Sequence, residues 1–177
     1  MKKKTKGILL IVFILIVVTA VGVIINYTKS QKIIKNLESA EIQIVNRGVE
    51  KEPLNLKELE TLTTTKFNAT LQRGVLQSDK EYAFAGFPLE KVLTFADLMP
   101  QDEEVLIIYS VEGYEWPFTR EELKQSKNIF LVYKEDGRYL GKYKDGLRQG
   151  PYMLLFLDNP LSWRWDKYIC RLELREK

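Results

Sequence analysis

An uninterrupted apolar run near the start of the chain constrains the fold most. Residues 7–25 contain no charged side chain, whereas the six residues before them include four lysines. In a helix, nineteen residues span about 29 Å, which matches one hydrocarbon core. Lysines that precede such a run keep the N-terminus in the cytoplasm. The sequence therefore predicts a basic cytoplasmic leader at residues 1–6 and a single-pass transmembrane helix, a signal anchor, at residues 7–27.

A cleaved signal peptide is the alternative interpretation of this segment. Val18-Thr19-Ala20 offers small residues at the offsets that a signal peptidase requires, with cleavage after Ala20, although the apolar run continues beyond it. The only cysteine, Cys170, lies far from this segment, which excludes a lipid-modified cysteine there. Both interpretations place the rest of the chain outside the cell membrane. We expect a stalk at residues 28–41 and an extracytoplasmic domain at residues 42–177.

The absence of histidine limits the chemistry that this chain can perform. Its 177 residues include no histidine and one cysteine. Catalysis by serine–histidine or cysteine–histidine pairs, an intrachain disulfide and a Cys/His zinc site are therefore excluded. The net charge of +3 comes from the lysines of the leader, and the remainder is close to neutral. We expect no nucleic-acid partner, because such a surface requires a basic patch.

Short apolar runs separated by turn residues predict an α+β domain with a mostly β core. The clearest strands are residues 105–109 and 129–133, which are rich in β-branched side chains. Asn46-Arg47-Gly48 and Asp136-Gly137 have the composition of tight turns, and Thr119 with Glu122 forms a capping-box pattern. Further strands are expected at residues 42–45, 63–71, 152–157 and 163–174, and Phe67 should face inward. A short helix is expected at residues 53–59. A second helix is entered through residues 84–89 and should bury Leu89, Val92 and Leu93.

Two phrases near the middle of the chain carry a family resemblance. Thr70-Leu71-Gln72 is followed, after a polar loop, by Phe84-Ala85-Gly86-Phe87-Pro88-Leu89 and then Val92-Leu93. This order resembles the sulfite-oxidase-type molybdopterin-binding domain, where T-L-Q-C precedes W-x-G-V-P-L-x-x-V-L. The resemblance extends over residues 42–174 through weaker phrases: Pro53 to Leu59, Ser110-Val111-Glu112-Gly113-Tyr114, Asp136 to Leu140, Gly150-Pro151 and Trp163 to Ile169.

The chain departs from this family at the residues that hold the cofactor. The family's cysteine supplies a thiolate to molybdenum, and Arg73 stands in its place. An arginine is a permanent cation with no lone pair to offer a metal. Met153 stands where the family often has an arginine that contacts the cofactor. The resemblance therefore implies the fold with a degenerate active site, no metal and no expected cofactor; a molybdopterin-dependent oxidoreductase with an altered cofactor site is the alternative.

Two kinds of binding remain as hypotheses for such a domain. A candidate pocket formed by Gln72, Arg73, Tyr114 and Arg148 would bind a small anionic ligand through the planar guanidinium of Arg73. The alternative is that Arg73 is a solvated loop residue. Residues 116–118 and 163–165 are rich in aromatic side chains and could bind an envelope protein, or they could belong to the core. Cys170 is predicted to be a core residue on the same face as Leu172 and Leu174.

Overall fold

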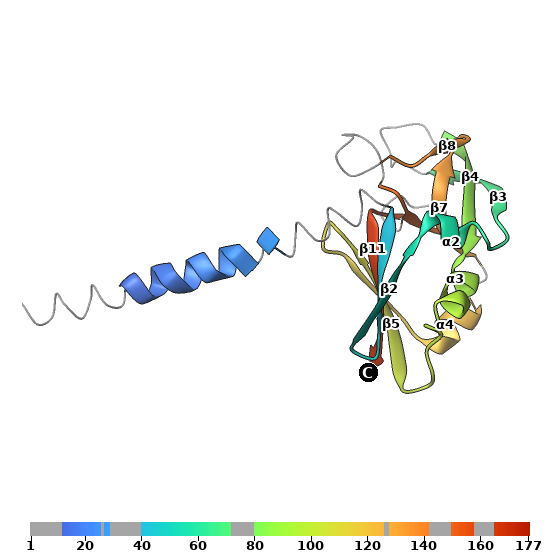
Figure 1. Cartoon of the computed structure of the whole chain (residues 1–177). Coiled ribbons are helices and arrows are strands. Elements are labelled where there is room, and N and C mark those ends of the chain that lie inside the picture. Colours follow the sequence, from blue (N-terminus) through green and yellow to red (C-terminus); the bar gives the residue numbers. More distant parts are fainter. Residues whose placement is uncertain are drawn as a thin grey trace, which may run out of the picture. The chain divides into compact units, whose positions relative to one another are not determined.

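The computed structural model describes residues 12–25, 27–28, 40–71, 80–125, 128–141, 150–157 and 165–177. The chain divides into two units, Met1–Lys35 and Asn36–Lys177. The described part of the first unit is a helix over residues 12–25, with two more helical residues at 27–28, and its apolar side chains are exposed (Figure 1). No helix among the described residues combines the length and the apolar character that crossing a membrane requires.

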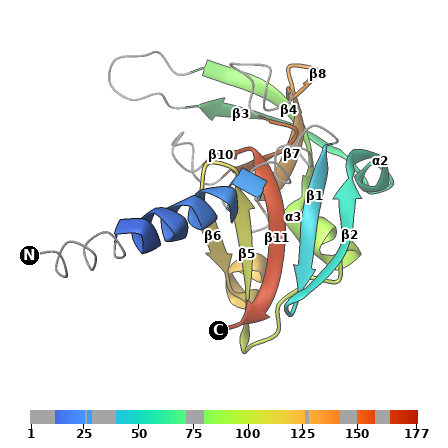
Figure 2. The same ribbon diagram turned by 60° about the vertical axis from the view of Figure 1, so that its left-hand side comes forward.

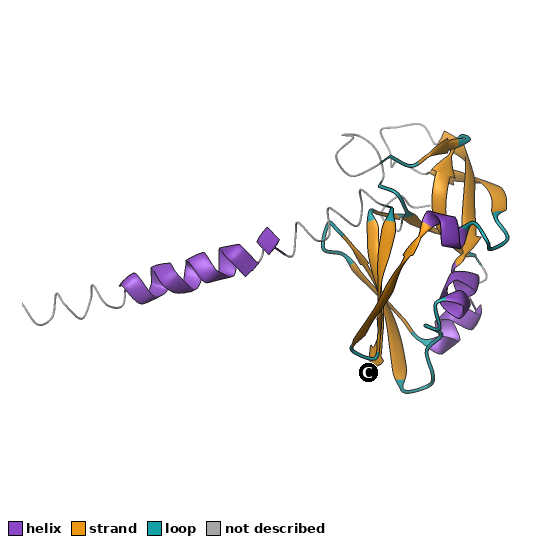
Figure 3. Cartoon of the chain, in the orientation of Figure 1, coloured by secondary structure: helices purple, strands orange, loops and turns teal. Residues whose placement is uncertain are grey.

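The second unit is mostly β, as predicted, with short helices between some of the strands (Figure 3). Its strands are β1 (Glu41–Asn46), β2 (Val49–Asn55), β3 (Thr65–Leu71), β4 (Lys80–Pro88), β5 (Glu104–Ser110), β6 (Glu115–Phe118), β7 (Ile129–Glu135), β8 (Arg138–Tyr139), β9 (Met153–Phe156), β10 (Asp166–Lys167) and β11 (Ile169–Glu176). Its helices are α2 (Leu56–Leu59), α3 (Leu89–Phe95) and α4 (Arg120–Gln125).

These strands form two sheets that share one core. The first sheet has the order β2-β1-β11-β5-β6, in which β1 is parallel to β11 and the other pairs are antiparallel. The second sheet has the order β10-β9-β7-β4-β3, with β8 paired to β7, and it is antiparallel throughout. Strand β11 therefore lies between the first strand of the domain and β5.

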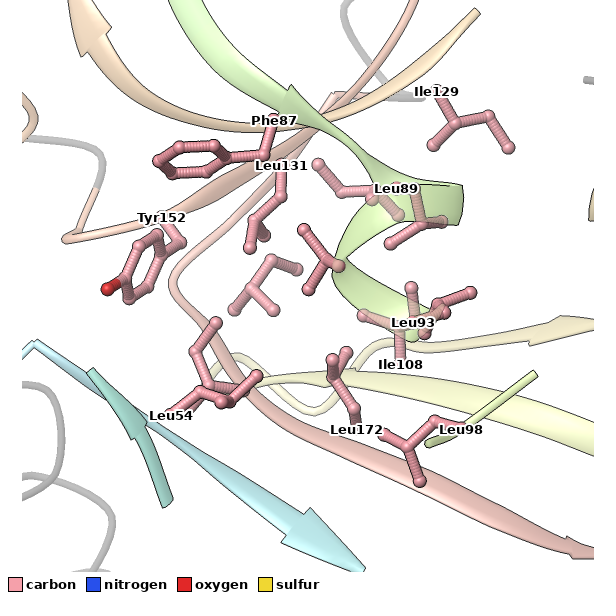
Figure 4. Close-up of a cluster of buried hydrophobic side chains, with 14 of the residues drawn as sticks. Leu54, Phe87, Leu89, Leu93, Leu98, Ile108, Ile129, Leu131, Tyr152 and Leu172 are labelled. Atoms are coloured by element: carbon pink, nitrogen blue, oxygen red, sulfur yellow. The ribbon is translucent and has the colours of Figure 1, made fainter. Parts of the chain in front are cut away.

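The main core lies between the two sheets and is closed by α3 (Figure 4). Ile108 and Leu172 come from the first sheet, Phe87 and Leu131 from the second, and Leu93 from α3; each is fully buried. A second apolar cluster covers the other face of the second sheet. It contains Tyr82, Phe84, Phe130, Val132, Leu140, Met153, Leu155 and Trp165, with Phe67, Ala69 and Leu157 partly buried against it. The second sheet is therefore apolar on both faces.

Several local predictions from the sequence are confirmed. The turn at Arg47 and Gly48 joins β1 to β2, and both residues have a positive φ. Asp136 and Gly137 do the same between β7 and β8. The capping box at the start of α4 is present, because Thr119 N–H donates to Glu122 Oε2 at 2.8 Å and Glu122 N–H donates to Thr119 Oγ1 at 3.3 Å.

Two of the strands that the sequence analysis missed contain residues that were expected to enter a helix. Residues 53–55 belong to β2, and the helix predicted from Pro53 begins at Leu56, where Asn55 and Glu58 form a capping box. Residues 84–88 belong to β4, and α3 begins at Leu89 with Pro88 as its N-cap. The buried face predicted for α3 is correct, since Leu89, Val92 and Leu93 are buried. Pairing with β3 and β7 gives β4 its strand conformation, and that pairing is not visible in local sequence.

The predicted face pattern of the last strand is wrong at its start. The pairing of β11 with β5 shifts register between Ile169 and Arg171, which is a β-bulge at Cys170. As a result Ile169 joins Leu172 and Leu174 in the main core, whereas Cys170 belongs to neither apolar cluster. The prediction that Cys170 is buried is nevertheless confirmed, because it is 5% exposed.

Candidate functional site

The turn between β5 and β6 carries Tyr114, the one predicted pocket residue that lies in the described part of the chain. Ser110 N–H donates to the Tyr114 carbonyl at 3.0 Å, and Gly113 N–H donates to the Ser110 carbonyl at 3.2 Å. Gly113 has φ +91°, a conformation that favours glycine. The Tyr114 side chain is 58% exposed. The turn thus presents a phenol to solvent from a hydrogen-bonded backbone.

A buried carboxyl group lies under this turn. Asp166 is 6% exposed, and its Oδ2 accepts a hydrogen bond from Trp116 Nε1 at 2.9 Å. Burial raises the pKa of Asp166, and the nearby charge of Glu112 raises it further. Hydrogen bonds from Trp116, from the Lys167 backbone and from the Ser110 hydroxyl oppose that rise. The carboxyl therefore depends on neutral donors rather than on a cation.

Ser110 connects this carboxyl group to Tyr114. The Ser110 hydroxyl hydrogen-bonds Asp166, and its oxygen accepts from the Tyr114 backbone N–H at 3.3 Å. Asp166 is enclosed, so it is suited to fixing the turn and not to reacting with a ligand. The exposed hydroxyl of Tyr114 remains as a donor or acceptor for a bound group. The sequence analysis missed Asp166, and no local signal marks it, because it lies next to Lys167 in a stretch that also contains other charged residues.

Gly150 packs against Tyr168, a residue that is hydrogen-bonded to the same turn. A Cβ placed on Gly150 would lie 2.3 Å from Tyr168 Cδ1 and 2.9 Å from Tyr168 Cα, so this backbone lies directly on that tyrosine. The Tyr168 carbonyl in turn accepts from Val111 N–H, in the β5–β6 turn, at 3.1 Å. Arg148 itself lies outside the described residues, as do Gln72 and Arg73. The structure thus brings the residue two positions after Arg148 close to the turn of Tyr114 and leaves the rest of the predicted pocket untested.

The only thiol of the chain is enclosed. Cys170 Sγ donates to the Tyr109 carbonyl at 3.5 Å, and burial raises its pKa to about 12. The thiol is therefore protonated at neutral pH, and a protonated thiol is a poor metal ligand. The described residues hold no group of three or more histidine, cysteine or acidic side chains that could bind a metal ion.

Met153 stands where the resemblance places a cofactor-contacting arginine, and the structure places it in an apolar environment. It is fully buried in the second apolar cluster, which also contains Phe130 and Trp165. Met153 offers only a weakly accepting thioether, which cannot replace the guanidinium of an arginine. Neither the buried thioether of Met153 nor the enclosed thiol of Cys170, the only cysteine of the chain, fits a molybdopterin centre of the standard type.

The described aromatic residues of the hypothetical partner surface belong to the interior. Phe118 and Trp165 are each 6% exposed, and Trp116 is half-buried. Trp116 packs against Phe156 with ring centroids 5.7 Å apart, and Trp165 meets Phe84 edge-on at 5.5 Å. Trp163 and Arg164 lie outside the described residues. The core interpretation therefore holds for Phe118 and Trp165, and Trp116 is partly buried against the main core.

A shallow groove of about 560 Å³ lies away from these residues. It runs between α3 and the connection from α2 to β3, and Phe95 at its edge is 47% exposed. Its lining residues are Thr61, Leu62, Thr63, Glu90, Lys91, Thr94 and Phe95. Its lining is mixed, and Tyr114, the one predicted pocket residue that the structure describes, does not belong to it.

Comparison with known proteins supports a fold relation. No family model matches the chain, and no curated protein matches it in sequence. The structure is similar to the crystal structure of the sulfane dehydrogenase SoxCD from Paracoccus pantotrophus, with a TM-score of 0.55 and 19% sequence identity. The match covers 80% of this chain and 39% of that chain, so this chain spans less than half of the SoxCD chain. At this identity the likeness establishes a distant relation to a sulfite-oxidase-like fold.

Proposed function

We propose that this protein is a membrane-anchored, extracytoplasmic binding module that uses the fold of the sulfite-oxidase-type molybdopterin-binding domain without a standard molybdenum site. The distant likeness to SoxCD supports the fold part of this proposal. The residues that would carry oxidoreductase chemistry in that family are replaced in this chain. Function must therefore be argued from the site and not from the fold.

The environment of Cys170 is the observation that carries this proposal. A molybdenum centre of this family requires a thiolate, and Cys170 is the only cysteine in the chain. It is buried in a β-bulge of β11, and its pKa of about 12 keeps it neutral. Ionising it at neutral pH would place an uncompensated charge in the protein interior. The only thiol that could replace the family's ligand is thus not available to a metal.

Thiol reactivity tests this observation directly. The full chain should not react with a thiol reagent such as iodoacetamide at pH 8 in its native state, and it should react at one site after unfolding in guanidinium chloride. The Glu112→Cys variant, which adds a cysteine at an exposed position, is the control for reagent access. Rapid reaction of Cys170 in the native protein would contradict this and make the thiol a candidate metal ligand again.

The ligand that best fits the candidate pocket is a small anion. Arg73 carries a planar cation at the position of the family's metal ligand, and Tyr114 presents an exposed hydroxyl from a hydrogen-bonded turn. Together these groups would bind a carboxylate or a phosphate.

Binding of inorganic phosphate and of citrate to the full chain tests the pocket. Calorimetric titration should show binding to wild type that falls at least about tenfold in Arg73→Ala, the loss of one charge-assisted hydrogen-bonding pair. Arg138→Ala is the matched control, because Arg138 is an exposed arginine on β8. Equal binding by all three proteins would contradict a role for Arg73.

The proposal of a membrane anchor rests on the sequence. Residues 7–27 contain the uncharged run behind four lysines, and the described helix at residues 12–25 exposes apolar side chains on all sides. Such a surface is stable in a bilayer and unfavourable in water. Extraction tests this part: the full chain should remain with membranes in alkaline carbonate, whereas a chain cleaved after Ala20 would be released.

An oxidoreductase is the second candidate, and the likeness to a protein named as a sulfane dehydrogenase favours it. It would have to hold molybdopterin through contacts other than a cysteine thiolate. Metal and pterin content separates this candidate from the binding module, because only the oxidoreductase requires both.

A further inference from the structure

Strand β3 forms an open edge of the second sheet. It pairs with β4 on one side, and no described strand pairs with its other side. Figure 1 places β3 at the outer margin of the sheet, and Figure 2 shows it beside β4. Its seven residues, Thr65–Leu71, contain no proline and a single charged side chain, Lys66. A strand of this length with free backbone groups is a template for pairing with another strand.

The backbone groups that β3 presents at this edge can be assigned from its neighbour. Ala83 of β4 accepts from Asp136 N–H at 2.7 Å and donates to Asp136 Oδ1 at 3.0 Å, so both of its polar groups point away from β3. Asn68 is the β3 residue opposite Ala83. In an antiparallel ladder such a pair is not hydrogen-bonded, and the polar groups of both residues point outward. By alternation, Lys66, Asn68 and Thr70 present their N–H and C=O groups at the free edge.

The other sheet edges are protected in ways that β3 is not. Strand β2 has three exposed charged residues, Glu50 to Glu52, followed by Pro53. Strand β6 has four residues, one of which is Pro117, and β10 has only two. Charges, prolines and short length are the usual means by which an edge strand avoids pairing. Among the described edges, β3 is therefore the one suited to an intermolecular contact.

We infer that β3 pairs antiparallel with β3 of a second copy of this chain, about a two-fold axis at Asn68. In this register the two Asn68 residues exchange backbone hydrogen bonds, and Lys66 does the same with Thr70 of the other copy. These are the residues whose polar groups point outward. The contact would join the second sheets of two copies into one continuous sheet.

The side chains are complementary in the same register. On the face of the second apolar cluster, Phe67 would lie opposite Ala69 of the other copy, a large residue against a small one, and both are already partly buried against that cluster. On the exposed face, Lys66 lies opposite Thr70 and in line with Glu81, the β4 partner of Thr70. The only charge of β3 thus faces no like charge and lies in the same row as an acidic residue.

Charge substitutions at Thr70 test this register in the full chain in detergent, by sedimentation velocity over a range of concentrations. Thr70→Glu places an acid opposite Lys66 and should strengthen the dimer at least about threefold; Thr70→Lys places two like charges opposite each other and should weaken it as much. Within one copy Thr70 lies beside Glu81, so the effects on the monomer have the opposite sign. Unchanged association in both variants would overturn the proposal.

Disulfide trapping provides the second measurement and does not depend on folding of a weakened variant. Asn68→Cys lies on the proposed axis and should form a cross-linked dimer on mild oxidation, because the two side chains are direct neighbours. Lys66→Cys and Thr70→Cys should each cross-link poorly alone and well when mixed, since these positions face each other. Wild type is the negative control, because its only cysteine, Cys170, is buried and should not cross-link. Equal cross-linking of all three single variants, or none at position 68, would overturn the register.

Discussion

A buried carboxyl group lies at each end of β5: Glu104 is the first residue of the strand, and Asp166 of β10 lies beside the last. The two groups are stabilised by different partners. At its start Glu104 is 7% exposed; its two oxygens accept from Arg47 Nε at 2.5 Å and Arg47 Nη2 at 3.1 Å, and Gln101 N–H donates at 2.8 Å. Hydrogen bonding to Arg47 lowers the pKa of Glu104. Beside its other end Asp166 has neutral donors, and burial raises its pKa.

This difference separates a structural end of the sheet from an end suited to binding. A carboxyl group that is hydrogen-bonded to a cation stays ionised at neutral pH, and the ion pair then stabilises the fold. A buried carboxyl group with neutral donors has no counter-charge to offset the cost of its desolvation, so its pKa is raised. The second arrangement lies under the turn of Tyr114, so the part of the domain proposed to bind a ligand rests on a buried carboxyl group that has no counter-charge.

The largest expected effect comes from two glycines with the same backbone angle. Gly48, beside Arg47, and Gly150, on Tyr168, both have φ +78°, but only Gly150 has atoms within 4 Å of an added Cβ. Gly48→Ala should cost about 1 kcal/mol from backbone strain alone. Gly150→Ala should cost about 2–4 kcal/mol, because Tyr168 must also move. Urea unfolding measures both; equal costs would show that the contact with Tyr168 is easily relieved.

Loss of the charge at Glu104 should have the next largest effect. Glu104→Gln should lower the free energy of unfolding at pH 7 by about 1–2 kcal/mol, towards the low end because half of the Arg47 side chain is open to water. The pKa of Glu104 is lowered in the folded state, so its contribution is present above the unfolded pKa and is lost as pH falls through the folded pKa. Wild type and variant should converge in acid. A gap that persists in acid would mean that the charge is not the cause.

Asp166→Asn should have a smaller effect and the opposite pH dependence. The amide keeps an acceptor for Trp116 and removes the buried charge, so at pH 7 stability should remain within about 1 kcal/mol of wild type or rise. The pKa of Asp166 is raised, so wild type is favoured below the unfolded pKa and loses that advantage as pH rises through the folded pKa. The variant should therefore gain on wild type with rising pH, as thermal unfolding from pH 3 to pH 8 would show. A variant that loses stability over this range would contradict the assignment.

The smallest effect on stability is expected at Tyr114. Its side chain is exposed, so Tyr114→Phe should change the free energy of unfolding by less than about 0.5 kcal/mol. Anion binding should weaken, because the hydroxyl is the group available to a ligand. Tyr139→Phe, another exposed tyrosine, is the control. Weakened binding in both variants would show that the effect is not specific to the turn.

The sequence predicted the turns and the helix start that depend on residues close together in the chain. The turns at Arg47-Gly48 and Asp136-Gly137 and the capping box at Thr119 are short-range signals, and the structure contains each of them. Strand β4 was missed because its conformation depends on pairing with β3 and β7, whose residues are distant in sequence. The same limitation hid the bulge at Cys170, since a single extra residue reverses which side chains face the core.

The candidate site was predicted only in part. A family phrase drew attention to Tyr114, and the structure adds the reason why its turn is fixed. Asp166 could not be recognised in that role because its partners, Ser110 and Trp116, are about fifty residues away in sequence, and only the fold brings them together. Arg73, Gln72 and Arg148 remain predictions.

Molybdenum and pterin content of the full chain tests the central claim most directly. The protein should be produced in a host that makes the cofactor and loads exported proteins, alongside an Arg73→Cys variant that restores the family's ligand at that position. The account predicts folded wild-type protein with neither molybdenum nor pterin in stoichiometric amount. Near-stoichiometric molybdenum in wild type would contradict the account and identify an oxidoreductase with an unfamiliar set of ligands.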